Sequence, residues 1–261
     1  MNDEKMNRRS FLQASTVLGV GSIVGASALL SACKGGNELV PLKQPGEFYV
    51  PELPDKAIDG KELKVGLVGC GGRGNGALAD LLNAANDIKV VALGDVFTDR
   101  IEDVRHNLKE KYNQVVPAEN CFVGFDSYKQ VIDSGVDMVI LTTPPVFRPL
   151  HFQYAVQKGK HSFLEKPIAV HAKGYRTIMA SAKQAQAKNL SVITGTQRHH
   201  ERPYVEANKL IQAGYIGEIT GGNVYWNQSM LWYRNREKGW SDMEWMIRDW
   251  VNWKWLSGDH I

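Results

Sequence analysis

The sequence is poor in cysteine and has no large excess of either charge. It contains 3 Cys among 261 residues, and its 31 Lys and Arg are nearly balanced by 28 Asp and Glu. Because the basic residues are mixed with acidic ones and form no stripe, we expect no nucleic-acid partner. Cys70 stands among glycines and Cys121 begins an apolar run. We therefore predict two small buried thiols with no disulfide between them, and no metal cofactor.

Long apolar runs are missing from the body of the chain, which excludes a membrane-spanning helix there. A weakly apolar stretch occurs near the N-terminus, over residues 17–30. Arg8 and Arg9 precede this stretch, an arrangement typical of twin-arginine export signals. The stretch leads into Cys33 through a sequence that resembles the lipobox of bacterial lipoproteins.

We therefore interpret residues 1–33 as an export signal and Cys33 as a lipidation site. Acyl chains on the Cys33 thiol and on the new amino terminus would anchor the protein to a membrane, because stable anchoring takes more than one chain. The expected location is the periplasm or cell envelope, reached by the twin-arginine route. The alternative is an N-terminal helix in which Cys33 occurs by chance.

The next segment, residues 34–60, is interrupted by Pro and Gly and predicts a linker. From Leu63 onwards, short runs of Val, Ile and Leu alternate with amphipathic segments. This alternation is typical of a doubly wound parallel sheet and predicts an α/β fold. The predicted strands are 63–69, 88–95, 121–125, 136–142, 161–165 and 190–196, and the predicted helices are 73–84, 99–112, 148–158 and 171–188.

The pattern changes after residue 197, where we place a domain boundary. Residues 201–214 predict a helix, and residues 218–228 alternate like a half-exposed strand. All seven tryptophans then lie between Trp226 and Trp255. We expect residues 198–261 to be the beginning of an α+β domain.

A glycine-rich turn joins the first predicted strand to the first predicted helix. Gly69, Gly71 and Gly74 have the G-x-G-x-x-G spacing. The first glycine permits a tight turn, the second lets the backbone approach a pyrophosphate, and the third lets the helix pack against the strand. Backbone N–H groups at the helix start, including those of Gly72 and Arg73, would then face the phosphates.

Asp95 ends the second predicted strand, about 20 residues after Gly74, where dinucleotide-binding units place a ribose-binding acid. Its carboxylate would accept hydrogen bonds from both ribose hydroxyls and would repel a 2′-phosphate. We therefore predict a Rossmann domain over residues 61–197 that binds NAD, with NADP less favoured. The alternatives are a glycine turn without a ligand, and a site for a flavin or S-adenosylmethionine.

A second motif follows the fifth predicted strand. Residues 159–167 have the sequence Gly-Lys-His-Ser-Phe-Leu-Glu-Lys-Pro, which resembles the G-K-H-V-x-x-E-K-P signature of the Gfo/Idh/MocA oxidoreductases. Thr143 and Pro144 match the T-P of this family after the fourth strand, and residues 216–219 resemble the entry to its C-terminal sheet domain. The resemblance covers about residues 63–261.

The resemblance implies NAD-dependent oxidation of a secondary hydroxyl of a sugar, glycoside or cyclitol by hydride transfer. Lys166 would face the substrate hydroxyl and the nicotinamide ring, and would assist deprotonation as hydride leaves the carbon. Glu165 would stand beside it at the cofactor, and the Lys166–Pro167 bond would be cis. Thr143, Pro144 and His151 would lie at the nicotinamide end of the cofactor, with a plain helix-face histidine as the alternative for His151.

Candidate substrate residues follow the sixth predicted strand. Arg198 and His199 would bind sugar hydroxyls there, or they form a solvated basic turn. Trp226 would stack on the C–H face of a sugar ring. Alternatively, the tryptophans fill a core or an oligomer contact, as large aromatic side chains mostly do.

Two other functions stay open. Some members of this family are NAD-dependent glycosidases that recycle the cofactor, which suits a compartment without an NAD supply. The other alternative is a non-catalytic dinucleotide-binding fragment. The family completes its active site with an acid and a His on a later helix, and Ile261 stands just before the place expected for them. We therefore expect a piece of a longer protein that forms homo-oligomers when complete.

Overall fold

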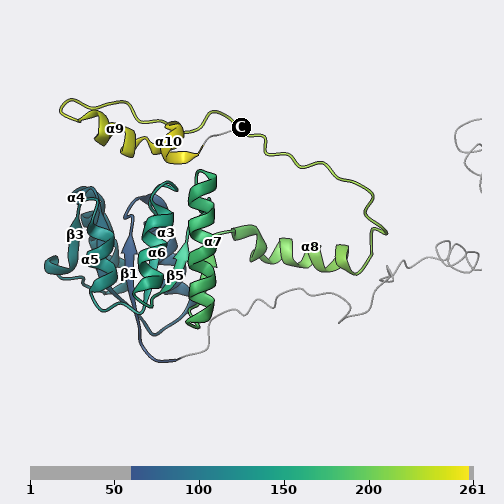
Figure 1. Ribbon diagram of the computed structural model, residues 1–261, viewed down its shortest axis with the longest axis horizontal. Coiled ribbons are helices and arrows are strands. Elements are labelled where there is room, and N and C mark those ends of the chain that lie inside the picture. Colours follow the sequence, from purple (N-terminus) through teal and green to yellow (C-terminus); the bar gives the residue numbers. More distant parts are fainter. Residues whose placement is uncertain (1–59, 259–261) are drawn as a thin grey trace, which may run out of the picture. The chain divides into compact units, whose positions relative to one another are not determined.

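The computed structural model describes residues 60–258 (Figure 1). The expected export signal over 1–33, with the lipidation site Cys33, lies outside the described residues, as does the predicted linker up to residue 59. Within residues 60–258, every helix is too short or too polar to span a bilayer. Export and lipid anchoring therefore remain predictions.

Six parallel strands form one sheet in the order β3-β2-β1-β4-β5-β6. β1 pairs with β2 on one side and with β4 on the other, so the direction in which strands are added reverses at β1. This is the strand order of the doubly wound nucleotide-binding sheet, and the predicted parallel α/β fold is confirmed. Each strand lies within its predicted range: β1 (Leu63–Val68), β2 (Ile88–Asp95), β3 (Cys121–Val123), β4 (Met138–Leu141), β5 (His161–Leu164) and β6 (Val192–Thr194).

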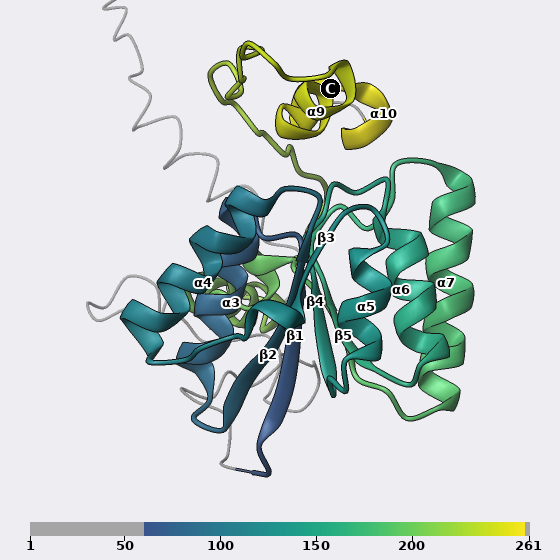
Figure 2. The ribbon, with the colours of Figure 1, turned by 90° about the vertical axis from the view of Figure 1, so that its left-hand side faces the viewer.

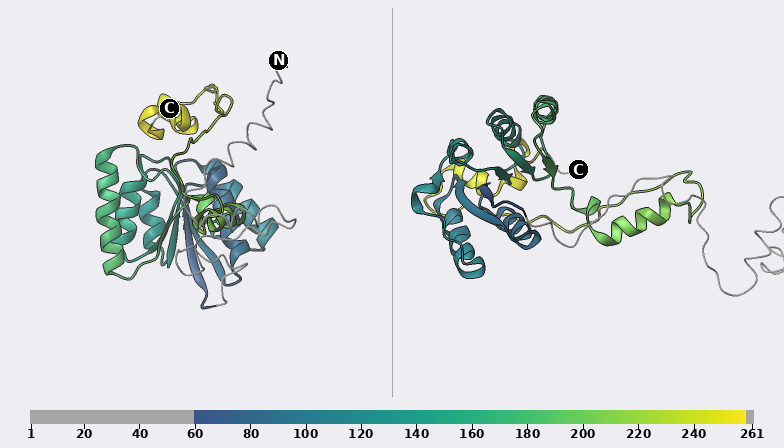
Figure 3. Two further views of the ribbon diagram at one scale, coloured as in Figure 1. Left: turned by 90° about the vertical axis from the view of Figure 1, so that its right-hand side faces the viewer. Right: turned by 90° about the horizontal axis from the view of Figure 1, so that it is seen from below.

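Helices cover both faces of this sheet, and Figures 2 and 3 show the resulting three layers. α3 and α4 lie against one face, and α5, α6 and α7 lie against the other. The sequence pattern does not predict α5, because its 7 residues are too few to show a helical period. These helices are α3 (Gly72–Ala84), α4 (Thr98–Tyr112), α5 (Ser127–Asp133), α6 (Arg148–Gln157) and α7 (Ala172–Ala187).

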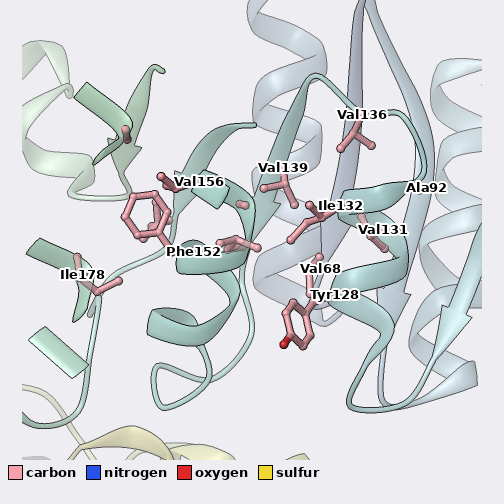
Figure 4. Packing of buried hydrophobic residues seen from close by; sticks show 14 residues of the cluster. Val68, Ala92, Tyr128, Val131, Ile132, Val136, Val139, Phe152, Val156 and Ile178 are labelled. Carbon is pink, nitrogen blue, oxygen red and sulfur yellow. The ribbon is translucent and has the colours of Figure 1, made fainter. Parts of the chain in front are cut away.

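Two hydrophobic clusters fill the space between the sheet and its helices. β4 contributes to both, because Val139 and Leu141 belong to one cluster while Ile140, between them, belongs to the other. Figure 4 shows the first cluster, in which Phe152 of α6 and Ile178 of α7 pack with residues of the sheet. Each fully buried side chain of this size contributes about 1.5–3 kcal/mol to folding. The two clusters thereby fix the strand ends from which the site is built.

Short helices and irregular chain follow the sheet. Residues 221–258 belong to the same compact unit as the sheet, whereas residues 208–220 fall outside that unit. The strand predicted over 218–228 is wrong, because these residues form no regular structure. An alternating segment becomes a strand only beside a partner strand, and Val224 at its centre is 98% exposed. The helices are α8 (Arg202–Gln212), which confirms the helix predicted there, α9 (Asp242–Arg248) and α10 (Lys254–Ser257).

Candidate functional site

A pocket of about 360 Å³ lies at the carboxyl ends of β1, β2 and β4. Doubly wound sheets bind their ligands at this edge, next to the point where the strand order reverses. The position therefore marks the pocket as the candidate cofactor site. Of the predicted cofactor residues, the pocket is lined by Gly69, Gly71, Gly72, Arg73, Gly74, Asp95, Thr143, Pro144 and His151.

The glycine turn has no room for side chains at its first and third motif positions. Gly69 has a φ of +96°, a conformation that favours glycine. A Cβ on Gly69 would lie 2.7 Å from the backbone nitrogen of Thr143, and a Cβ on Gly74 would collide with the carbonyl oxygen of Gly69. The Thr142 hydroxyl donates a hydrogen bond of 2.6 Å to that same oxygen. The turn is therefore held against the end of β4 as well as against α3.

Helix α3 begins at Gly72, directly after this turn, and residues of its first turn line the pocket. Its N-cap, Gly71, provides no side-chain cap, and its first turn contains no acidic residue. The first backbone N–H groups of a helix have no partner within the helix and form the positive end of its dipole. Such a cradle binds a diphosphate, so the residues present fit a dinucleotide.

Asp95 ends β2 at the pocket and is only 8% exposed. Its Oδ2 accepts a hydrogen bond of 2.6 Å from the backbone N–H of Cys70, and its Oδ1 accepts one of 3.0 Å from that of Phe97. Burial raises the pKa of Asp95, and these two N–H groups oppose the rise. The carboxylate therefore fixes the glycine turn to the end of β2, while each oxygen keeps a lone pair for a ribose hydroxyl.

Arg100, in the first turn of α4, lines the pocket although no sequence motif singles it out. Its guanidinium carbon lies 5.7 Å from the centroid of the Phe97 ring. Burial lowers the pKa of Arg100, and the charge of Asp95 acts in the opposite direction. An arginine beside the ribose acid can accommodate a 2′-phosphate, so the preference between NAD and NADP depends on both residues.

His151 of α6 lies at the pocket in a closely packed setting. Its ring stacks on Tyr128 with 4.2 Å between the centroids, and its Nδ1 is 3.3 Å from the Thr143 hydroxyl. Burial, and then the charge of Arg148, lower the pKa of His151 to about 3. The imidazole is therefore neutral at pH 7, and His151 is a pocket residue and not a solvated residue on the helix surface.

Arg148, at the start of α6, is a buried cation that the motifs do not predict. One end of its guanidinium donates to the carbonyl oxygen of Thr143 through Nη2, and the other donates to that of Pro167 through Nη1. Burial lowers the pKa of Arg148 to about 10, while nearby Glu165 opposes this change. Arg148 therefore ties the segment after β4, which contains Thr143, to the turn after β5, which contains Pro167.

Glu165 and Lys166 follow β5, and the Lys166–Pro167 bond is cis, as expected. Glu165 is buried, with its Oε2 at 3.3 Å from Nε of Arg73, and this oxygen has no hydrogen-bond partner among residues 60–258. A side chain on Gly195 would collide with the same carboxylate. Lys166 is exposed. Neither Glu165 nor Lys166 lines the pocket, but Glu165 is connected to it through Arg73.

The predicted substrate residues lie elsewhere. Arg198 and His199 are exposed in a short turn, Gln197–His199, after β6. The guanidinium carbon of Arg198 lies 4.8 Å from the ring centroid of Trp226, so these two residues do meet. However, Arg198, His199 and Trp226 are all outside the pocket. From the tryptophan-rich region, the pocket is lined instead by Trp232, Arg234, Ile247 and Trp250.

Comparison with known proteins adds two kinds of relative. The glycosyl hydrolase family 109 protein from Shewanella pealeana is 24% identical over 230 residues, which cover 87% of this chain and 47% of that protein. Inositol 2-dehydrogenase from Salmonella typhimurium is 29% identical over 157 residues, which cover 60% of this chain and 43% of that protein. The chain thus spans about half the length of the curated relatives it matches.

A solved structure and a family model agree on the fold. The crystal structure of scyllo-inositol dehydrogenase from Lactobacillus casei, with bound NAD(H) and scyllo-inositol, matches with a TM-score of 0.50 and 25% identity. The match covers 61% of this chain and 44% of that one. The family model described as the oxidoreductase family with an NAD-binding Rossmann fold matches residues 63–194, about half of this chain. The chain therefore belongs to the Gfo/Idh/MocA family of oxidoreductases, through an NAD-binding Rossmann domain.

Proposed function

We propose that the complete protein is an NAD-dependent oxidoreductase that oxidises a secondary hydroxyl of a sugar or cyclitol by hydride transfer. One observation carries this proposal: the Arg148 guanidinium joins the carbonyl oxygen of Thr143, at the pocket, to that of Pro167, next to Lys166. Arg148 therefore connects the cofactor pocket to the turn that carries Lys166, whose amine is the proposed catalytic group. The inositol dehydrogenases among the relatives support the substrate class.

The adenosine end of the pocket favours NAD over NADP in this proposal. Asp95 presents a negative charge where the 2′-phosphate of NADP would lie. Repulsion between the carboxylate and the phosphate makes NADP binding less favourable. Arg100 partly offsets that charge, since it lines the same pocket. We therefore expect a preference for NAD and weaker binding of NADP.

At the proposed nicotinamide end of the pocket, His151 is closely packed and uncharged, and carbonyl oxygens accept hydrogen bonds from the charged Arg148. His151 is neutral at pH 7 because its pKa is about 3, and the charge of Arg148 faces two carbonyl oxygens. Bound NAD would supply a nicotinamide ring that accepts the hydride. A neutral His151 does not repel this cationic ring, and its stacking on Tyr128 keeps the imidazole in place.

Lys166 then has the task of holding the substrate hydroxyl and moving its proton. Its side chain is exposed at the carboxyl end of β5, where a substrate can reach it. The backbone that carries it is fixed by Arg148 on one side of the turn. For the proposed role, the substrate hydroxyl has only to come within hydrogen-bond distance of the Lys166 amine.

A second candidate is an NAD-dependent glycosidase, in which the hydroxyl is oxidised, the aglycone is eliminated, water adds and the product is reduced again. The observation that favours it is the length of the matches. The family 109 glycosyl hydrolases of Shewanella pealeana and Solibacter usitatus match over 230 and 250 residues, well beyond the Rossmann domain, whereas the inositol dehydrogenase matches over 157. The same pocket and Lys166 would serve both reactions.

We also propose that the protein is exported by the twin-arginine route and held at the cell envelope through a lipid on Cys33. The support is the order of features in the first 33 residues: paired arginines, an apolar stretch, and a lipobox-like end. This route carries folded proteins, so the cofactor would leave the cytosol already bound. A recycled or tightly held NAD suits such a location.

The first prediction concerns cofactor choice. Replacing Asp95 with Asn should weaken NAD binding by roughly 10–100-fold, because a charged hydrogen-bond acceptor is lost. NADP binding should weaken less, so the ratio of the two dissociation constants shrinks. Isothermal titration with each nucleotide measures this, and Asp103→Asn on the exposed face of α4 is the matched control. Equal affinity of the unaltered protein for NAD and NADP would contradict the proposed preference.

The second prediction concerns catalysis. Replacing Lys166 with Ala in the complete protein should reduce turnover by about 10²–10⁴-fold, the usual contribution of an acid–base group, and leave the dissociation constant for NAD nearly unchanged. Initial rates with inositols and sugars, together with NADH fluorescence, measure the two effects. Lys173→Ala, an exposed lysine of α7, is the control. Full activity without the Lys166 amine would remove it from the mechanism.

The third prediction separates the two reactions. With a simple sugar or cyclitol, the dehydrogenase should accumulate NADH, seen by its absorbance. With a p-nitrophenyl glycoside, the glycosidase should release p-nitrophenol without net reduction of NAD. Sustained p-nitrophenol release without NADH would favour the second candidate, and NADH accumulation without p-nitrophenol release would favour the first.

The fourth prediction concerns anchoring. In bacterial cells, Cys33→Ser should move the protein from the membrane fraction to the soluble fraction, because the acylated thiol is lost. Immunoblots of the two fractions measure the shift. Cys121→Ser, within the folded domain, should leave the protein with the membranes. Membrane association that survives in Cys33→Ser would rule out this anchor.

A further inference from the structure

Part of the pocket is formed by residues far along the chain from the glycine turn. Trp232, Arg234, Ile247 and Trp250 line it together with Asp95 and other residues that follow β2. They come from the segment that belongs to the same compact unit as the sheet. We call residues 232–250 the outer wall.

A bidentate ion pair fixes the outer wall to helix α4 of the Rossmann domain. Arg248 of α9 donates from Nη1 and Nη2 to the two carboxylate oxygens of Asp99, over 2.9 and 3.0 Å. Its guanidinium carbon also lies 3.8 Å from the centroid of the Phe97 ring, and its Nε donates to Glu244 over 3.0 Å. Only 12% of the Arg248 side chain is exposed. Paired and stacked in this way, the guanidinium is a strong and directional contact.

The ion pair stands close to the ribose end of the pocket. Asp99 is in the first turn of α4, just after Asp95, which ends β2, and Phe97, which is the N-cap of α4. Pairing raises the pKa of Arg248 and lowers that of Asp99, so both groups are charged at neutral pH. The contact therefore holds the outer wall where the adenosine of a dinucleotide would lie.

The outer wall is also braced internally. The buried carboxylate of Asp249 accepts hydrogen bonds from the backbone N–H of Arg234, over 2.7 Å, and from the Asn252 amide, over 2.9 Å. The indole N–H of Trp245 donates to the carbonyl oxygen of Arg234 over 2.8 Å. These bonds join the segment around Arg234 to α9, and Arg248 in turn joins α9 to α4.

We propose that the outer wall binds the adenosine half of the cofactor, and that the Arg248–Asp99 pair keeps it closed over the bound nucleotide. The inference rests on the proposed function, since it takes the pocket to be the NAD site. The indoles of Trp232 and Trp250 supply flat apolar surfaces for the adenine, and Arg100 and Arg234 supply positive charge for the diphosphate of the dinucleotide. A nucleotide enclosed in this way leaves only when the ion pair opens.

The test measures the dissociation of NADH from the complete protein by stopped-flow fluorescence, with excess NAD as the competitor. Asp99→Asn and Arg248→Gln should each raise the dissociation rate constant by about tenfold, with little change in the association rate constant. The double variant should be no faster than either single variant, because all three lose the same contact. Exchanging the two residues, Asp99→Arg with Arg248→Asp, should restore most of the slow dissociation.

The matched control is the Arg236–Asp242 ion pair, which also joins residues of the outer wall, at 2.7 Å, but does not line the pocket. Arg236→Gln should leave the dissociation rate unchanged. Circular dichroism checks that each variant folds. Folded Asp99 and Arg248 variants that bind NADH and release it at the normal rate would overturn this inference alone. An unaltered protein that binds no NADH would overturn the proposed function as well.

Discussion

Helix α3 approaches β1 so closely at Gly74 that a single methyl group would collide with the carbonyl oxygen of Gly69. The pocket depends on this approach, because it brings the first turn of α3 to the strand end and leaves the backbone of the glycine turn uncovered. Asp95 and Thr142 then hold the turn from the neighbouring strands β2 and β4. Three strand ends and one helix start are thus fixed to one another before any cofactor binds, which is the preorganisation that binding benefits from.

The two ends of the pocket are braced by different arginines. At the proposed nicotinamide end, Arg148 is buried, and its Nη1 and Nη2 donate to carbonyl oxygens of two turns, which connects the pocket to the turn that carries Lys166. At the adenosine end, Arg248 pairs with Asp99, which lies 149 residues earlier in the sequence. Both bind through the fork of the guanidinium, which a lysine would not reproduce.

The sequence alone predicts the strands and the glycine turn because their signals are local. Runs of Val, Ile and Leu mark strands that are buried on both faces, and the spacing of Gly69, Gly71 and Gly74 follows from the turn itself. Arg148 could not be predicted in this way, because no motif singles it out. The outer wall could not be predicted either, because Asp99, the partner of Arg248, lies 149 residues earlier in the sequence. The strand expected over 218–228 is wrong for a related reason. Alternating polar and apolar residues indicate which side of a strand would be buried, but they do not reveal whether a partner strand lies beside it.

Cys70 stands between the two first glycines of the motif, with its thiol buried and 3.6 Å from the carbonyl oxygen of Gly94. Burial, reinforced by the charge of Asp95, raises its pKa well above the usual range. Because only the thiolate attacks disulfides and peroxides readily, this sulfur is a poor target for oxidants. The glycine turn would therefore keep its shape in an oxidising medium, which is the condition that the proposed export would impose on it.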